Sequence, residues 1–475
     1  MAGDGEPGAL TELALRSGAW YGDRMIALDI PSSWHLRTFW PQTPRPLSES
    51  ELVAAFEAPV GQPPIRELAR GKRKPVIIVD DLTRPTPAHR VMPLILKQLH
   101  EAGVVADQVT VVMGGGTHRP ATLQQMLLKV GPTAQRCRLI VHDPKADTAW
   151  IGRTSFGSPV IVNREVAASD LLIGIGGIYP QHSVGFGGGS KLLLGVLGKR
   201  SIVSLHYGHG SVAGSYDVDN DFRRDLDEMA RLVGLKTVIT LHVNADREVV
   251  RAVSGDHHSY YLDGVAFSRD AYSAPAPGDA DVVVVNAYPA DVSLTFTRSK
   301  GMAPLQLAQA GASRILISAC SEGLGYHGLF PFMNGPAFEK QIHNLRRLSV
   351  IKPSSVLPKL ARRALGVAGR ARRQMVAARN APVAMTRPRG VRPQPGPLRE
   401  VWLHSPVGRP VSLPPSIPGM VAVDSWAEVL RSVDREQGGR RGLDVAVYPC
   451  APLHCLDVAG LDIADHLAGS AGQAG

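Results

Sequence analysis

A histidine and a lysine flank a glycine-rich stretch near the middle of the chain. His182 precedes Lys191 by nine residues, and four of the five positions 185–189 are glycine. Because glycine lacks a side chain and tolerates positive φ, a ligand can approach such a backbone closely. A lysine beyond the run can act as a point charge or, when burial lowers its pKa, as a nucleophile. The glycines of this first candidate site are Gly185, Gly187, Gly188 and Gly189.

A phosphate-binding loop is the nearest general pattern to this stretch, but the match fails at two positions. That loop requires a second glycine directly before the lysine and a hydroxyl residue directly after it. Here Ser190 precedes Lys191 and Leu192 follows it. Hydrolysis of a nucleoside triphosphate is therefore disfavoured.

An acidic pair and an arginine follow an apolar run at 74–80. They belong to the motif D-D-L-T-R-P-T-P at 80–87. Asp80 and Asp81 can bind a polar ligand at a strand end, and Arg84 can hold a carboxylate or phosphate in a fork. Aspartate, threonine and proline are also common in caps and turns, so a structural role is the alternative.

His118 follows a run of three glycines at 114–116. A histidine on such a loop is exposed to whatever occupies the neighbouring cleft, and its ordinary pKa near 6.5 suits acid–base chemistry. A lone histidine is often structural. The glycine-rich strand end favours a functional role here.

Two histidine groups have spacings that occur among metal ligands. His206 and His209 are three residues apart, but one such pair is weak evidence for a metal. Cys450, His454 and Cys455 could hold zinc only with further ligands, so core or surface cysteines are the favoured interpretation.

The surrounding elements predict an α/β fold with a parallel sheet. Apolar runs precede the three motifs, and a helical pattern separates the first two of them. Strands alternating with helices favour right-handed crossovers, and ligands of such sheets lie beyond the carboxyl ends of the strands. The expected strands are 74–80, 108–113, 138–141 and 170–175, and the expected helix is 88–102.

A second α/β unit is expected after a linker at 265–280. We predict an N-terminal cofactor and catalytic domain over 1–270 and a C-terminal domain over 279–475. Cationic residues of the second unit facing the strand ends of the first would suit an anionic substrate in an interdomain cleft. Its expected strands are 281–286, 314–318, 401–404, 420–423 and 443–448, with a helix at 302–310, and its polar candidates are Asp291, Arg298 and Lys300.

Composition indicates an ordinary globular protein of 475 residues, 44% of them hydrophobic. Two or three domains are the expectation for this length. The N-terminal residues lack the pattern of a signal peptide, no apolar run is long enough to span a bilayer, and four cysteines do not make a disulfide framework. We therefore expect a cytoplasmic protein without membrane contact.

The positive charge is concentrated in one segment. Residues 341–400 contain 14 Lys and Arg against one acid, so the remainder of the chain is slightly acidic although the whole carries +10. Such a segment could bind nucleic acid or another acidic partner, but it has no aromatic residue for base stacking. A solvated insertion at 341–398, with a helix at about 355–380, is the favoured interpretation.

Taken in order, D-D-L-T-R-P-T-P, G-G-G-T-H-R and the His182 to Lys191 stretch with a following histidine resemble the nickel-dependent lactate racemase family. The resemblance is strongest over 77–210 and extends over roughly 20–330. It implies two α/β domains with the active site between them. It also implies racemisation or epimerisation of a 2-hydroxy acid by reversible hydride transfer to a nickel-pincer nucleotide. Enzymes that synthesise this cofactor would then be partners.

The resemblance also assigns roles to individual residues. Lys191 would be joined covalently to the pyridinium mononucleotide, a thioamide/thiocarboxylate pincer around nickel. The downstream histidine that binds nickel would be His206, with His209 as the rival. His118 and His182 would be an acid–base pair on opposite sides of the substrate carbon. The other residues implied to contact cofactor or substrate are Asp81, Arg84, Gly187, Gly188, Gly189, Arg298 and Lys300.

Two rival functions remain open from the sequence. The family typically has a Tyr-Gln pair where Thr295 and Phe296 stand, which predicts a different or larger 2-hydroxy acid than lactate. The first rival is a relative without the cofactor, acting as another isomerase or a lyase. The second is a protein that binds nucleic acid or an acidic partner through 341–400.

Overall fold

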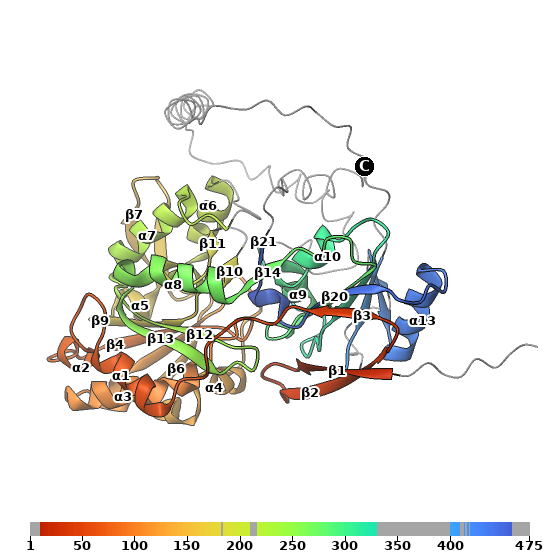
Figure 1. The fold of residues 1–475 in the computed structure, drawn as a ribbon. Helices are drawn as coiled ribbons and strands as arrows, with labels where there is room; N and C mark the ends of the chain where they lie inside the picture. Colours follow the sequence, from red (N-terminus) through yellow and green to blue (C-terminus); the bar gives the residue numbers. More distant parts are fainter. Residues whose placement is uncertain are drawn as a thin grey trace, which may run out of the picture. The chain divides into compact units, whose positions relative to one another are not determined.

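The computed structural model describes residues 10–181, 184–209, 216–329, 400–408, 413, 416–417 and 419–457 (Figure 1). His182, the basic segment at 341–398 and the helix expected at about 355–380 lie outside these residues. Among the described residues, no helix is long and apolar enough to cross a membrane.

The first of two large sheets has six strands in the order β13-β12-β9-β4-β5-β6. All neighbours pair in parallel except the edge strand β13, which is antiparallel to β12. This sheet confirms the predicted α/β class. Its parallel strands appear in the sequence as continuous apolar runs because they are buried on both faces. The strand bounds are β4 Pro75–Asp80, β5 Thr110–Gly114, β6 Arg138–Val141, β9 Leu171–Gly176, β12 Thr237–Val243 and β13 Val249–Asp256.

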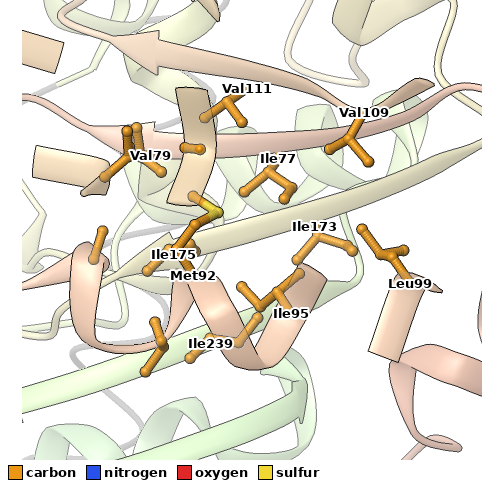
Figure 2. Close-up of a cluster of buried hydrophobic side chains, with 14 of the residues drawn as sticks. Ile77, Val79, Met92, Ile95, Leu99, Val109, Val111, Ile173, Ile175 and Ile239 are labelled. Atoms are coloured by element: carbon orange, nitrogen blue, oxygen red, sulfur yellow. The ribbon is translucent and has the colours of Figure 1, made fainter. Parts of the chain in front are cut away.

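Alternate side chains of these strands enter two separate cores. Ile77 and Val79 of β4 pack with Ile95 of helix α3 (Met92–Glu101) on one face (Figure 2). Val76 and Ile78 pack on the other face, in the core that contains side chains of the short helix η4 (Gly189–Val196). Successive side chains of a strand point to opposite faces of the sheet, so the same strands contribute to both cores. Both cores therefore lie directly beside the strand ends that carry the motifs.

The remaining helices and short strands connect or cover this sheet. The helices are α1 Glu49–Glu57, α2 Ile65–Leu68, α4 Leu123–Val130, α5 Arg164–Ala167, α6 Lys199–Gly208, α7 Asp221–Val233 and α8 His257–Ala271. The short 3₁₀ helices are η1 Ala88–Arg90, η2 Ala106–Gln108 and η3 Pro132–Arg136. The strands β7 Thr148–Arg153 and β8 Pro159–Asn163 form a hairpin, and β10 Pro180–Gln181 pairs with β11 Gly185–Phe186.

The second large sheet has seven strands in the order β18-β19-β17-β16-β15-β20-β3, and only β18 is antiparallel. The strands are β3 His35–Thr38, β15 Val282–Asn286, β16 Ser313–Ile317, β17 Val401–His404, β18 Ser416–Ile417, β19 Met420–Val423 and β20 Asp444–Tyr448. Its helices are α9 Leu294–Lys300, α10 Ala303–Leu307, α13 Trp426–Glu436 and the 3₁₀ turn η6 Ala451–Leu453.

The N-terminal residues join this second sheet. Strand β3 pairs with β20, and the hairpin of β1 (Leu10–Ser17) and β2 (Arg24–Pro31) packs its apolar face against β15 and β20. Residues 10–38, expected in the first domain, are therefore bound to the second sheet. The division of the chain at 270 and 279 stays a prediction.

The expected linker at 265–280 is instead largely ordered structure. Helix α8 continues to Ala271, and β14 (Ser273–Pro275) pairs with β21 (Cys455–Asp457). Buried side chains recur at helical spacing through the last turns of α8, from Tyr261 to Val265 and Ser268. The prolines and the glycine that favour a linker lie only at the end of the range, at 275–278.

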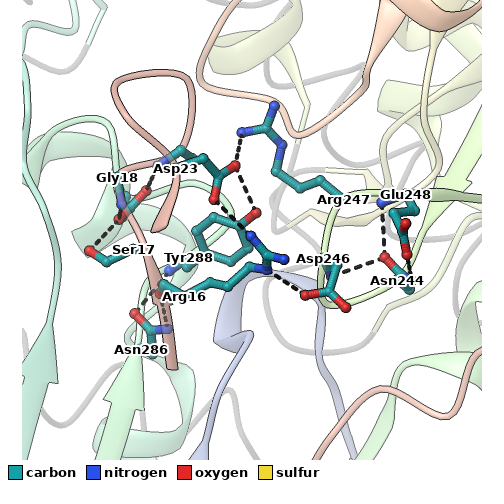
Figure 3. A network of polar contacts seen from close by, with 12 residues as sticks. Arg16, Ser17, Gly18, Asp23, Asn244, Asp246, Arg247, Glu248, Asn286 and Tyr288 are labelled. Atoms are coloured by element: carbon teal, nitrogen blue, oxygen red, sulfur yellow. Dashed lines mark hydrogen bonds and ion pairs between the residues drawn. The ribbon is translucent and has the colours of Figure 1, made fainter. Parts of the chain in front are cut away.

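Polar contacts connect the two sheets around the turn between β1 and β2 (Figure 3). Asp23 accepts from Arg247 Nη1 at 2.9 Å and from Tyr288 Oη at 3.1 Å. Arg16 pairs with Asp246 in the β12–β13 turn, and Asn286 Nδ2 donates to the Arg16 carbonyl at 2.8 Å. This turn therefore bonds to elements of both sheets.

Candidate active site

The three sequence motifs converge on one cavity of about 330 Å³ at the carboxyl ends of β4, β5 and β9. This is the location expected for ligands of a parallel sheet. Elements of the second sheet complete its wall, chiefly α9, the loop at 320–329 and η6. The predicted site residues that line it are Asp81, Arg84, His118, Gly187, Gly188, Lys191, His206 and Lys300.

His118 is oriented by an acidic partner. Its Nδ1 lies 2.6 Å from Asp81 Oδ2. Burial alone would raise the pKa of Asp81, but the His118 ring, the Arg84 charge and the Thr83 hydroxyl lower it below the ordinary value. Burial lowers the pKa of His118 despite the attraction of Asp81. Asp81 is thus the ionised acceptor of Nδ1–H, which leaves Nε2 of a neutral ring able to accept a proton.

A buried lysine that the sequence did not reveal lies behind this pair. Lys129 of α4 is fully buried, and its Nζ is 2.6 Å from Asp80 Oδ1. The same Nζ donates to the carbonyls of Asp81 at 3.1 Å and Arg84 at 2.9 Å. Lys129 therefore holds the loop that carries two predicted site residues.

Lys300 reaches the same loop from the second sheet. Its Nζ donates to the Thr83 carbonyl at 2.7 Å. Burial, together with the nearby Arg84 charge, holds the pKa of Lys300 well below its ordinary value. An anion bound in the cavity beside Lys300 and Arg84 would therefore be attracted by both side chains.

Lys191 lies in the cavity with an unusually acidic ammonium group. Burial, followed by repulsion from Arg84 and Arg223, lowers its pKa to about 7. Near neutral pH a substantial fraction of its side chain is then the free amine, which is the nucleophilic form. Burial of a lysine beside other cations is a pattern of functional sites rather than of stable cores.

The glycine-rich stretch is shaped by close packing on both sides. Gly187 and Gly188 line the cavity. Gly188 has φ +73°, and a Cβ there would lie 2.5 Å from Ile178 Cγ1. Gly189, with φ +55°, does not line the cavity, and a Cβ there would meet the ring of Tyr261 at 2.9 Å. The glycines are thus required by the backbone conformation as well as by the cavity.

The structure separates the two rival metal ligands. His206 lines the cavity, its Nδ1 lies 2.9 Å from the Ile202 carbonyl, and burial with the Lys191 charge lowers its pKa to about 4. Its ring is therefore neutral, as metal binding requires. His209 does not line the cavity and instead pairs with Asp225 through Nε2 at 2.7 Å. The geometry favours His206.

Two cavity residues of the second sheet were not identified as functional from the sequence. His327 lies with its ring 5.1 Å from that of His118, and burial lowers its pKa to about 2. Phe296 packs edge-on against His118 at 4.4 Å between ring centroids. Neither belongs to a glycine-rich motif, and only the position of Phe296 near Lys300 gave a signal.

Two polar candidates of the second sheet do not line the cavity. Arg298 is half-buried outside it. Asp291 is fully buried and accepts from the backbone of Gly18 at 2.8 Å and of Ala19 at 3.1 Å. Asp291 therefore fixes the β1–β2 turn rather than a ligand.

The C-terminal cysteines belong to the core, as favoured from the sequence. Cys450 and Cys455 are buried free thiols, and burial raises the pKa of Cys455 to about 12. His454 between them lines the cavity. The described residues contain no cluster of three or more metal-ligating side chains.

The residues present fit a nucleotide cofactor that carries its own metal. Lys191 offers an amine, His206 offers one neutral nitrogen ligand, and Arg84 offers a fork for a phosphate. Beside these residues, the backbone at Gly114 is in direct contact with the backbone at Gly195, because a Cβ added to Gly114 would lie 2.9 Å from the carbonyl carbon of Gly195.

Comparison with known proteins identifies the relatives of this chain. Residues 21–214 match the model of the lactate racemase N-terminal domain. The lactate racemase of Lactiplantibacillus plantarum is 29% identical over 322 residues, which cover 64% of this chain and 75% of that protein. These matches support the lactate racemase family for this chain. The lactate racemase of Thermoanaerobacterium thermosaccharolyticum is 28% identical over 328 residues, or 65% of this chain and 76% of that protein.

A solved structure is similar to this chain at the level of the fold. The lactate racemase apoprotein from T. thermosaccharolyticum superposes with a TM-score of 0.65 at 21% identity, over 94% of this chain and 100% of that chain. The α/β architecture with two large sheets is therefore shared.

Proposed function

We propose that the chain is an isomerase that racemises or epimerises a 2-hydroxy acid with a nickel-pincer nucleotide. Its similarity to two lactate racemases supports racemase activity. The observation that carries the proposal is the presence of Lys191, with a pKa of about 7, in the same cavity as His206 and the Asp81–His118 pair. Enzymes that make the cofactor would be partners of the chain.

The cofactor, when bound, supplies an acceptor for hydride from the substrate C2. Lys191 would hold it covalently, with Gly187 and Gly188 leaving room for it and His206 as the ligand to nickel. Arg84 and Asp81 would contact cofactor or substrate.

His118 would move the hydroxyl proton of the substrate. Asp81 accepts Nδ1–H at 2.6 Å and so fixes the tautomer with Nε2 as proton acceptor. Inversion requires a second acid–base group on the opposite face of the planar keto acid. The family resemblance assigns that role to His182, which lies outside the described residues.

Substrate selection would depend on the wall from the second sheet. Lys300 and Arg84 suit the carboxylate, whereas Phe296, Leu453 and Pro452 offer an apolar surface. We propose a 2-hydroxy acid with a larger, apolar substituent than the methyl group of lactate.

Isotope retention tests the proposed chemistry. The holoenzyme is incubated with single enantiomers of 2-hydroxy acids that carry deuterium at C2, and the products are resolved by chiral chromatography and mass spectrometry. Hydride transfer predicts inversion with the deuterium kept and with a primary isotope effect. Loss of the deuterium to water during inversion would indicate proton abstraction from carbon and contradict the proposal.

A further inference from the structure

Lys129 contacts the loop at 80–84 beside the candidate active site through two main-chain carbonyls and the Asp80 carboxylate. Its side chain is fully buried and does not line the cavity. Three oxygen atoms surround its Nζ, namely Asp80 Oδ1 at 2.6 Å, the Arg84 carbonyl at 2.9 Å and the Asp81 carbonyl at 3.1 Å. Nζ therefore donates two hydrogen bonds to the carbonyls and forms an ion pair with the Asp80 carboxylate.

The number of these contacts exceeds what charge compensation requires. Burial lowers the pKa of Lys129, and Asp80 opposes that effect. The Trp20 ring, with its centroid 4.7 Å from Nζ, adds a cation–π contact. The two carbonyl oxygens carry no formal charge, so the hydrogen bonds to them do not serve to compensate the charge of Asp80.

Those carbonyls belong to two loop residues that line the cavity. Asp81 holds His118 by its carboxylate, and Arg84 is the predicted anion-binding residue. The Arg84 amide also donates to the Asp81 carbonyl at 3.1 Å, which closes the turn between them. A shift of either carbonyl would therefore move a side chain in the cavity.

We propose that Lys129 is a positioning residue, which sets the placement of Asp81 against His118 and of Arg84 in the cavity through its bonds to their two carbonyls. This role rests on the proposed function. The alternative is that Lys129 only neutralises Asp80 within the core.

A double-mutant cycle over Asp80 and Lys129 separates the two roles. Lys129→Met keeps the length of the side chain and removes all three donors, whereas Asp80→Asn removes the charge that Lys129 would neutralise. The holoenzyme is measured as wild type, D80N, K129M and D80N/K129M, with the exposed Lys97→Met of α3 as the matched lysine control. The double variant also avoids an uncompensated buried carboxylate.

A positioning role predicts that K129M lowers kcat at least tenfold both in the wild type and in D80N, with K97M unchanged. Full recovery of kcat in D80N/K129M to the level of D80N would show that Lys129 acts only on the Asp80 charge, and would overturn the proposal.

A second readout uses the apoprotein and needs no activity. The Nδ1 proton of His118, bonded to a carboxylate at 2.6 Å, is expected as a downfield resonance that is lost in His118→Gln. In D80N/K129M it should shift or vanish relative to D80N. An unchanged resonance in the folded double variant would overturn the positioning role. A shift combined with no racemisation by wild-type holoenzyme would instead overturn the proposed function alone.

Discussion

The two walls of the cavity differ in how their side chains are held. On the wall from the first sheet, Asp81 is paired with His118, and Asp80 is paired with Lys129 behind the wall. The wall from the second sheet combines the apolar Phe296 and Leu453 with the rings of His327 and His454. Its Lys300 extends to a backbone carbonyl of the first wall. Preorganised charges suit chemistry and an apolar surface suits selection of a substituent. Under the proposed function, the first wall would therefore carry the catalytic groups and the second would select the substrate.

The largest expected effect is that of His118→Gln on the first wall. Glutamine retains a donor toward Asp81 but cannot accept a proton. We expect a loss of kcat of roughly 10³-fold, within the range for removal of a general base. Initial rates of racemisation followed by circular dichroism measure it. A changed KM with kcat within threefold of wild type would remove His118 from the chemistry.

On the second wall, Phe296→Gln should change the preference between substrates more than the rate of the reaction. Replacing the ring by an amide removes apolar contact, so the ratio of kcat/KM for a bulky apolar 2-hydroxy acid over lactate should fall about tenfold. Competition between the two substrates measures this ratio. Leu262→Gln on the exposed face of α8 is the control. An unchanged ratio would show that specificity does not depend on this wall.

In the absence of cofactor, the buried Lys191 of the first wall should destabilise the folded protein. Its folded pKa of about 7 lies below the ordinary value of 10.5, so the unfolded chain binds more protons between these pH values. The stability of the wild-type apoprotein should therefore rise with pH across this window. Lys191→Met should raise Tm by several degrees, most below pH 7 and less as pH approaches 10. Thermal melts across pH test this, and a gain independent of pH would contradict the lowered pKa.

The smallest expected effect is that of Arg298→Gln. Because Arg298 does not line the cavity, kcat and KM should stay within about twofold of wild type. Lys300→Gln is the informative partner, since it should raise KM. A tenfold rise of KM in Arg298→Gln would show that the substrate reaches beyond the cavity.

The sequence predicted best what depends on short-range pattern. Buried parallel strands have continuous apolar runs, so the strands before Asp80 and Gly114 were located to within two residues, and their ends indicated the site. Lys129 was missed because a lysine near the end of an amphipathic helix usually faces solvent. Its burial depends on Asp80, which lies 49 residues earlier in the chain.

The sequence also did not predict which distant segments of the chain pair with each other. Nothing in residues 35–38 indicates that they pair with β20, about 400 residues later. His327 likewise enters the cavity through a bridge with His118 that no local signal encodes. Conversely, the prolines and glycine near 275–278 suggested a linker although helix α8 extends to Ala271.

The most direct test of the central claim is the intact mass and metal content of the protein co-expressed with the cofactor-making enzymes. We predict a mass adduct on the wild-type chain that localises to Lys191, with bound nickel, and no adduct on Lys191→Ala. His206→Ala should keep the adduct and lose nickel. A wild-type chain with neither adduct nor nickel would contradict the proposed function and favour a relative that works without the cofactor.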